Sequence, residues 1–203
     1  MTETVPEYTE LPLGHFLDMV ASREPAPGGG ASAAVAVALA AALTAMAARF
    51  STGHLDDAEA IAGKAEELRS RVMPLARADA VAYGRVLDAY RIPHDDDEEE
   101  RRRRIREALS EAADVPLSIA EVGVEVVGNA ARLAEEGNPN LRGDAVTAAV
   151  LAGAGVRAAI TLVEINVSAG GADDDRLSRV DQLLATMAAV QEVVEGTEAR
   201  SRG

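Results

Sequence analysis

Two aspartates occupy positions where the helical pattern of the sequence otherwise places apolar residues. Asp79 follows Leu75 by four residues and Val72 by seven, so the three side chains share one helix face. Counting back seven residues from Leu151 reaches Asp144, in the opening turn of a later helical segment. A carboxylate on a buried face is costly unless it is paired or has a chemical task, so both acids are candidates for acid and base catalysis. For Asp144, a role in capping the helix start is an equally open interpretation.

A proline- and glycine-rich stretch is the second candidate feature. Residues 24–30 read Glu-Pro-Ala-Pro-Gly-Gly-Gly and lead directly into an alanine-rich segment, residues 31–50. The prolines favour an extended entry, the glycines remove side chains, and alanine favours a helix. The first N–H groups of that helix would open onto a glycine-lined hollow that suits a negatively charged or carbonyl-bearing ligand. The alternative is that the glycines only allow another helix to pass close by.

Apolar residues at helical spacing predict the elements that must position these groups. Residues 13–20 form a short helix, and a long helical pattern over residues 56–91 should be kinked or divided at Pro74. The other predicted helices are an exposed, charged one at residues 95–106, one that follows Pro116 and ends at residues 137–139, one that ends near Asn166, and a last one that starts at residues 173–175. Because β-type alternation is absent, the fold class is all-α. A single domain, residues 1–203, forms a bundle of about six or seven helices, with loose ends at residues 1–10 and 197–203.

The composition argues against several classes of function. The net charge of −14 opposes nucleic-acid binding, which needs a basic surface. The absence of cysteine removes disulfides and thiolate chemistry, and the three histidines lack metal-ligand spacing, so no metal site is predicted. Residues 31–50 are long enough to cross a membrane, but alanine is a weak hydrophobe, so a buried helix is predicted instead. Since no signal peptide is evident, the expected location is the cytoplasm.

Residues 25–30, Pro-Ala-Pro-Gly-Gly-Gly before an alanine-rich helix, resemble the signature of the cyclodeaminase/cyclohydrolase family. That family includes the C-terminal domain of formiminotransferase-cyclodeaminase and bacterial methenyltetrahydrofolate cyclohydrolases. Three further stretches agree in order: residues 79–83, residues 114–117, and residues 137–140 leading to Asp144. Asn166 matches an asparagine that the family tends to carry near the end of its next helix. The resemblance covers about residues 11–190.

The resemblance implies an all-helical, usually dimeric protein that holds folate between its helices. It implies attack on the one-carbon unit that links N5 and N10 of tetrahydrofolate. In one version water adds to the methenyl carbon and gives 10-formyltetrahydrofolate. In the other, N10 attacks a 5-formimino carbon and ammonia leaves. No tightly bound cofactor is implied, because the tetrahydrofolate derivative is itself the substrate.

The resemblance also assigns roles to residues. Asp79 would move protons and offset the positive charge of the one-carbon unit, and Asp144 would be a second acid/base or would orient a water or the pterin. The residues expected to hold the substrate are Glu24, Pro27, Gly28, Gly29, Gly30, Ser32, Tyr83, Asn140 and Asn166. The family usually places serine directly after the three glycines, whereas here Ala31 stands there and the hydroxyl follows at Ser32. The basic cluster expected after the alanine-rich helix is thin, which leaves Arg49, Lys64 and Arg142 as candidates for binding the glutamate tail.

Two other readings stay open on the sequence alone. The chain could be a non-catalytic helical protein that kept a folate-like binding site. It could also be a dimeric scaffold whose small-residue helices pack against a partner, with the aspartates paired structurally. The residues alone do not choose between cyclohydrolase and cyclodeaminase chemistry.

Overall fold

The computed structural model describes residues 5–93, 97–171 and 175–200. Within these ranges the chain is helical and contains no strand, so the all-α prediction is confirmed. The elements in order are the short 3-10 helix η1 (Tyr8–Glu10), α1 (Leu13–Val20), α2 (Gly29–Arg49), α3 (Ala58–Val72), α4 (Leu75–Tyr90), α5 (Glu98–Glu136), the 3-10 helix η2 (Pro139–Leu141), α6 (Arg142–Gly170) and α7 (Asp175–Arg200).

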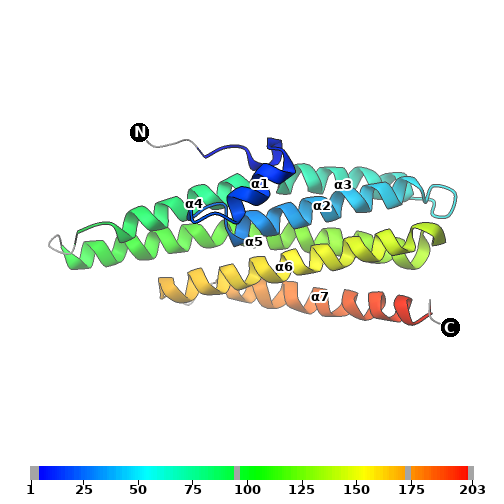
Figure 1. Ribbon diagram of the computed structural model, residues 1–203. Coiled ribbons are helices and arrows are strands. Elements are labelled where there is room, and N and C mark those ends of the chain that lie inside the picture. The colour runs from blue at the N-terminus through cyan, green and yellow to red at the C-terminus, as the bar shows by residue number, and fades with distance from the viewer. Residues whose placement is uncertain (1–4, 94–96, 172–174, 201–203) are drawn as a thin grey trace.

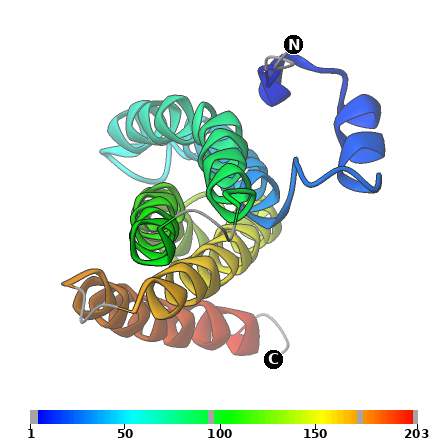
Figure 2. The same cartoon turned by 90° about the vertical axis from the view of Figure 1, so that its left-hand side faces the viewer.

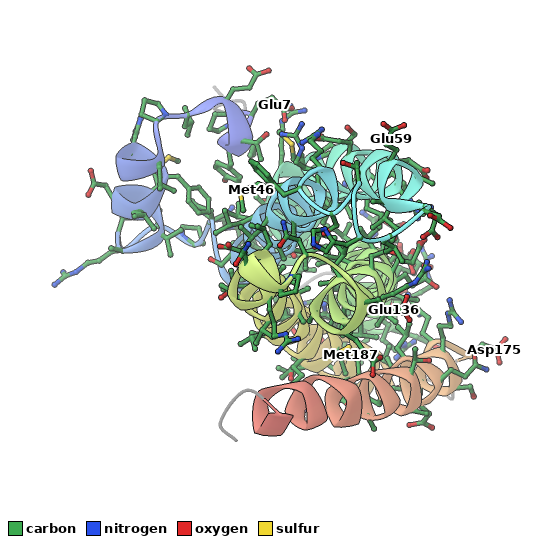
Figure 3. The ribbon with its side chains drawn as sticks, turned by 90° about the vertical axis from the view of Figure 1, so that its right-hand side faces the viewer. Glu7, Met46, Glu59, Glu136, Asp175 and Met187 are labelled. Carbon is green, nitrogen blue, oxygen red and sulfur yellow. The ribbon has the colours of Figure 1, made fainter. Side chains whose placement is uncertain are left out.

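The two longest described helices, α5 and α6, pack along each other and form the centre of an elongated bundle (Figure 1). Helix α2 packs against both α6 and α3, while α4 continues the line of α3 and lies on α5. Helix α7 covers α5 and α6 on the opposite side, and α1 stands apart from the bundle (Figure 2). Met187 points from α7 toward the bundle (Figure 3), and a Cβ on Gly153 of α6 would lie 3.2 Å from its Cε.

Small side chains explain how the helices approach so closely without aromatic residues between them. Within α2, Ala34, Val37 and Ala41 have no exposed surface. A Cβ on Gly155 of α6 would lie 2.7 Å from Cγ2 of Val37. A Cβ on Gly123 of α5 would meet Val156 in the same way, at 2.5 Å. At these two contacts a glycine lies where the neighbouring helix presents a valine, and this close packing supplies dispersion contacts in place of large rings.

The two prolines in helical regions behave differently. Pro74 divides the long pattern as predicted, because α3 ends at Val72 and α4 begins at Leu75. Pro116 does not mark a helix boundary, so that part of the prediction is wrong: it is buried in the interior of the continuous helix α5. Tertiary contacts with α4, α6 and α7 along α5 outweigh the local cost of the proline.

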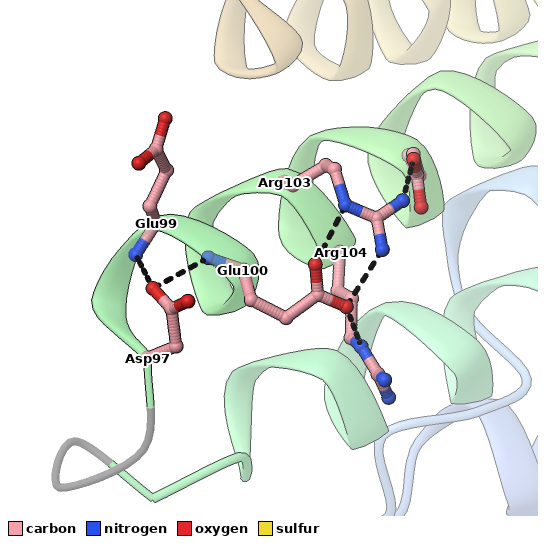
Figure 4. A network of polar contacts seen from close by, with 6 residues as sticks. Asp97, Glu99, Glu100, Arg103 and Arg104 are labelled. Atoms are coloured by element: carbon pink, nitrogen blue, oxygen red, sulfur yellow. Dashed lines mark hydrogen bonds and ion pairs between the residues drawn. The ribbon is translucent and has the colours of Figure 1, made fainter.

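The charged stretch at the start of α5 is exposed, as predicted. Residues 95 and 96 lie outside the described residues, and α5 begins after Asp97, whose carboxylate accepts the N–H groups of Glu99 and Glu100 (Figure 4). Glu100 binds Arg103 at 2.6 Å and Arg104 at 2.7 Å. These exposed pairs support the helix locally and do not reach the core.

The predicted loose ends, residues 1–10 and 197–203, are folded in their described parts, while residues 1–4 and 201–203 lie outside the described residues. Residues 5–10 are not loose: Tyr8 is only 4% exposed, and its ring centroid lies 5.9 Å from that of Phe16. At the other end α7 extends to Arg200, so residues 197–200 are helical. The predicted helix at residues 13–20 is confirmed as α1. On its apolar face Phe16 is buried, whereas Leu13 and Leu17 are exposed.

Among the described residues, two helices are long and apolar enough to cross a membrane by length and composition: residues 29–49 and residues 139–170. About half of each window, 56% and 50%, is buried inside the bundle, and α2 and α6 pack against each other. Core helices of globular proteins pass the same test, so the composition of these two segments is weak evidence for a membrane span.

Candidate active site

The Asp79 carboxylate sits at the N-terminus of α2. Its Oδ2 accepts a hydrogen bond from the N–H of Ala31 at 3.2 Å, so α4 supplies a capping group to another helix. A Cβ on Gly30 would lie 1.9 Å from Oδ1 of Asp79, which makes glycine necessary for this contact. The sequence predicted that the N–H groups at this helix terminus open onto a hollow for an anionic ligand. In the structure, one of these N–H groups, that of Ala31, instead binds the carboxylate of Asp79 from the chain itself. Asp79 and the glycine run thus meet, as their predicted roles require.

Burial dominates the electrostatics of Asp79. Loss of water around the carboxylate raises its pKa above the usual value, and the hydrogen bond from Ala31 opposes this rise without cancelling it. Carboxylates that cap helix starts ordinarily gain stability from the helix dipole. Here the cost of removing water from the charged carboxylate is larger than this gain. A raised pKa brings the group closer to the range in which it can both take and release a proton at physiological pH.

A cavity of about 300 Å³ opens beside Asp79. It lies where α2, α4, α5 and α6 meet the loop before α2. Its lining residues are Pro25, Ala26, Gly28, Gly29, Gly30, Asp79, Ala80, Tyr83, Ala112, Leu162, Ile165 and Asn166. Six of the predicted site residues are therefore brought together, namely the three glycines, Asp79, Tyr83 and Asn166. Of these, Tyr83 is 44% exposed and stands at the open side.

The position of Asn166 in the cavity wall depends on Pro116. Because proline has no N–H, it cannot bond the carbonyl four residues earlier in α5, that of Ala112. The side-chain amide of Asn166 donates to this freed carbonyl at 3.1 Å. The pairing explains physically why Pro116 and Asn166 occur together in the sequence, and it ties α6 to α5 at the cavity. Sequence reasoning missed Ala112, because a backbone carbonyl leaves no residue-type signal.

Three predicted binding residues lie near the cavity without lining it. The hydroxyl of Ser32 donates to the carbonyl of Gly28 at 2.9 Å, so its proton is used within the first turn of α2. Glu24 is exposed, and its backbone N–H donates to the hydroxyl of Ser22. Pro27 is buried within the loop. Their predicted contacts with a ligand stay predictions.

Asp144 and Asn140 lie at the other end of the bundle. Asp144 is in the first turn of α6, and 22 residues separate it from Asn166, which corresponds to about 33 Å of helix at 1.5 Å per residue. Asn140 is in η2, where its N–H donates to the side chain of Asn138 at 3.0 Å. Within one copy of the chain, neither residue lines the cavity that contains Asp79.

The predicted cations for a glutamate tail are also outside the cavity lining. Arg49 pairs with Glu66 at 2.8 Å, and Lys64 pairs with Glu125 at 3.1 Å. Arg142 begins α6, at the end of the bundle that holds Asp144. Among the described residues, no group of three or more histidine or acidic side chains is arranged to hold a metal ion.

Comparisons with known proteins identify the family of this chain. The family model described as formiminotransferase-cyclodeaminase matches residues 12–186. A methenyltetrahydrofolate cyclohydrolase from Methylorubrum extorquens is 37% identical over 195 residues, covering 90% of this chain and 93% of the relative. The crystal structure of formiminotetrahydrofolate cyclodeaminase from Thermotoga maritima matches with a TM-score of 0.83 and 32% identity, covering 94% of this chain and 97% of that one. The chain therefore belongs to the formiminotransferase-cyclodeaminase family.

Proposed function

We propose that this chain is a folate one-carbon enzyme, and that its reaction is the hydrolysis of 5,10-methenyltetrahydrofolate to 10-formyltetrahydrofolate. The observation that carries the proposal is a single desolvated carboxylate, Asp79, at the wall of a cavity large enough for a bicyclic ring. The methenyl group is cationic, so a carboxylate beside it offsets its charge. The 37% identity to a methenyltetrahydrofolate cyclohydrolase supports the same reaction.

In this proposal, Asp79 handles the proton of the attacking water. Asp79 accepts a proton as the water oxygen bonds to the methenyl carbon, giving a neutral tetrahedral adduct. The adduct then loses its hydroxyl proton to solvent, the C=O bond forms, and the bond from carbon to N5 breaks. Asp79 returns its proton to N5, so the sum is one water consumed and one proton released. A carboxyl group with a raised pKa is suited to both the accepting and the returning step.

The other lining residues provide shape and orientation. Leu162 and Ala80 give the cavity apolar surface, and the half-exposed ring of Tyr83 offers a face against which a flat ring can stack. Backbone groups of Gly28 and Gly29 reach the cavity without side chains, so ring nitrogens and carbonyls can approach them closely. No tightly bound cofactor is needed, because the substrate carries the one-carbon unit.

Cyclodeamination of 5-formiminotetrahydrofolate is the second candidate. It is favoured by the match to the Thermotoga maritima cyclodeaminase across 94% of this chain. In that reaction N10 attacks the formimino carbon and ammonia leaves, so a proton donor is required at the leaving nitrogen. A protonated Asp79 could serve as that donor, because burial favours its neutral form. The remaining alternative, a non-catalytic folate binder or scaffold, predicts no turnover of either substrate.

We also propose that the chain is a homodimer. Large apolar side chains stay exposed on or next to the two adjoining helices α2 and α6: Leu39 at 58% on α2, Phe50 at 62% directly after α2, and Val150 and Ile165 at 57% each on α6. Exposed large apolar side chains on adjoining helices are typical of an interaction surface when they gather in one patch. If two copies pack antiparallel on it, Asp144 of one copy approaches the Asp79 cavity of the other, which is how Asp144 could act as the second acid. A cytoplasmic location remains a prediction.

Two substrates distinguish these proposals. The purified chain is incubated with 5,10-methenyltetrahydrofolate, whose absorbance is followed, and with 5-formiminotetrahydrofolate, for which methenyl absorbance and ammonia are measured. We expect loss of methenyl absorbance in the first assay, faster than in buffer. Ammonia release in the second assay would instead identify the cyclodeaminase. If neither substrate reacts, the enzyme proposal is wrong. Thermal stabilisation by folate, about 2.7 kcal/mol at 100 times Kd, then separates a binder from a scaffold.

A further inference from the structure

The segment at residues 5–11, termed the N-terminal strap here, is fastened to the helix that carries Asp79. The guanidinium Nε of Arg77 donates to the carbonyl of Val5 at 2.8 Å, and the same side chain pairs with Glu7 at 3.1 Å. Helix η1 of the strap packs against α4. Because Arg77 is only two residues before Asp79, the strap is anchored at the turn of α4 that bears the proposed catalytic acid.

Tyr8 is the strap residue that enters the core. It is 4% exposed and belongs to one buried cluster with Ala31, Ala76 and Ala80. Ala76 and Ala80 lie on either side of Asp79 in α4, and Ala31 is the residue whose N–H binds the Asp79 carboxylate. Tyr8 also lines a second cavity, of about 270 Å³, which is separate from the one at Asp79. Tyr8 therefore packs in the core beside the Asp79 site, without lining the cavity at Asp79 itself.

The position along α2 agrees with this placement. Ala31, Val35 and Ala38 share one face of α2, since they are four and seven residues apart. Val35 and Ala38 line the second cavity together with Tyr8, whereas Ala31 holds Asp79. Tyr8 thus packs about one to two helical turns beyond the contact with Asp79, on the same side of α2.

The electrostatics give Tyr8 a definite state. Burial raises the pKa of its phenol, and the negative charge of Asp79 raises it further, so the carboxylate is within electrostatic reach and the phenol stays neutral at physiological pH. Of the other charged groups near the strap, Arg77 pairs with Glu7 and Arg69 pairs with Glu66, while Glu10 is exposed. The α2 residues that line the second cavity with Tyr8 are all uncharged: Val35, Ala38, Leu39 and Ala42. Tyr8 therefore acts on Asp79 as an uncharged ring, without transferring a proton.

We propose that the N-terminal strap covers the junction of α2 and α4 next to the Asp79 site, and that Tyr8 is a positioning residue whose ring limits the access of water to the Asp79 carboxylate from that side. The strap lies before the residues that match the family model, 12–186. Its consequence for turnover rests on the proposed function, in which Asp79 moves the proton. Its effect on the carboxylate itself does not depend on any substrate.

The test compares Tyr8→Ala, Tyr8→Phe and a control, Ile61→Ala, in the full chain. Ile61 is 5% exposed and belongs to a different buried cluster, so its truncation weakens the core without touching the strap. Two quantities are measured for each variant after folding is verified by circular dichroism. One is the titration of the Asp79 carboxyl carbon by NMR, assigned with Asp79→Asn. The other is the pH profile of kcat/KM with 5,10-methenyltetrahydrofolate.

We expect Tyr8→Ala to move the Asp79 titration to lower pH, because water regains access to the charged form. The pH profile should shift in the same direction. Tyr8→Phe keeps the ring and should restore the wild-type midpoint, and Ile61→Ala should leave that midpoint in place. The proposal is overturned if Tyr8→Ala leaves the midpoint unchanged, if Tyr8→Phe shifts it as far as Tyr8→Ala, or if Ile61→Ala shifts it equally. Should the chain turn over no folate, the NMR titration still decides whether the strap shields Asp79.

Discussion

Polar side chains meet both ends of α2, and the two ends use them differently. At the C-terminal end, the hydroxyl of Ser51 donates to the carbonyl of Ala47 at 2.8 Å and accepts from the N–H of Asn138 at 2.9 Å. The amide of Asn138 donates to the carbonyl of Phe50 and accepts from the N–H of Asn140. These groups bind to the chain itself. At the N-terminal end, Asp79 accepts the Ala31 N–H and borders a cavity.

The difference separates a structural joint from a reactive site. Where a buried hydroxyl or amide is satisfied on both its donor and acceptor sides, it fixes two segments together. A buried carboxylate whose pKa is raised by desolvation is kept in a less favourable state, and such groups concentrate at functional sites. Stretches that resemble the family lie at both ends of α2, residues 25–30 at one end and residues 137–140 at the other. The resemblance alone therefore does not tell which end is the reactive site. The environment of each polar group is what distinguishes them.

The largest effect should come from Asp79→Asn. This change removes the ionisable group at the reactive end while keeping a hydrogen-bond acceptor for Ala31, so the fold should persist. We expect kcat for 5,10-methenyltetrahydrofolate to fall by about 10²-fold or more, as for loss of a general acid or base. A folded variant with wild-type kcat would contradict the assignment. Asp144→Asn provides a matched measurement at the other end, and its loss of activity would support a contribution from a second copy.

A pair of glycine substitutions compares the two ends directly. In Gly30→Ala the new Cβ would lie 1.9 Å from Oδ1 of Asp79, and this carboxylate can swing aside. We therefore expect a folded protein with turnover reduced at least tenfold. In Gly137→Ala the Cβ would lie 2.5 Å from the backbone carbonyl of Leu133 and 2.9 Å from the hydroxyl of Ser51. Backbone must move there, so the free energy of unfolding should fall by about 1–3 kcal/mol, with turnover per folded molecule retained.

Kinetics and thermal unfolding of both glycine variants check this comparison. The two ends differ as described only if Gly30→Ala loses more activity than stability and Gly137→Ala loses more stability than activity. Equal losses in both quantities for both variants would mean that the joint and the site are one cooperative unit, and the distinction between them would be wrong.

Much of this arrangement could be predicted from the sequence, since it depends on local pattern. Helical spacing and alanine content identify the helices, and the position of Asp79 on an apolar stripe indicates an inward-facing acid. The division at Pro74 follows from proline's missing N–H. The interior position of Pro116 could not be predicted, because α5 is held across the proline by neighbouring helices and by the bond from Asn166 to Ala112.

Sequence reasoning is most limited where the position of a residue depends on contacts with distant parts of the chain. Asp79 and Asp144 have the same signature, an acid on an apolar stripe, yet α6 carries Asp144 to the far end of the bundle. Tyr8 has no periodic neighbours and lies in an acidic tail, so it gives no local signal of burial. Its position depends on the contacts between Arg77 and the strap, which are tertiary.

At the structural end of α2, Ser51→Ala should reduce stability without reducing turnover. The hydroxyl is almost fully buried, at 1% exposure, and its removal leaves the N–H of Asn138 without this acceptor. Loss of a buried partner costs about 1–3 kcal/mol. Urea unfolding measures the change, and kcat at a temperature where the variant is folded serves as the control. A loss of kcat comparable to that of Asp79→Asn would show that this end is catalytic too.

The raised pKa of Asp79 also predicts how stability depends on pH at the reactive end. A carboxyl whose pKa is higher in the folded than in the unfolded state binds its proton more tightly when folded. Its contribution to stability is therefore fully present below the unfolded pKa, near 3.8, and is lost as pH rises through the folded pKa. Asp79→Asn removes this loss, so the variant should melt at a higher temperature than wild type at neutral pH. The difference should diminish in acid, and thermal melts across pH check both points.

The smallest effect should come from Glu100, at the exposed start of α5. Hydrogen bonds from Arg103 and Arg104 lower the pKa of Glu100 to about 2, so its contribution to stability is present above the unfolded value of 4.5 and is lost as pH falls toward 2. Glu100 lies at the surface, however, and ion pairs there are screened by water and salt. Glu100→Gln should therefore change the melting temperature less than any variant above, and should leave kcat unchanged. A large decrease in melting temperature at low salt would mean that the number of hydrogen bonds affects stability more than burial does. The contrast between the two ends of α2 would then need another cause.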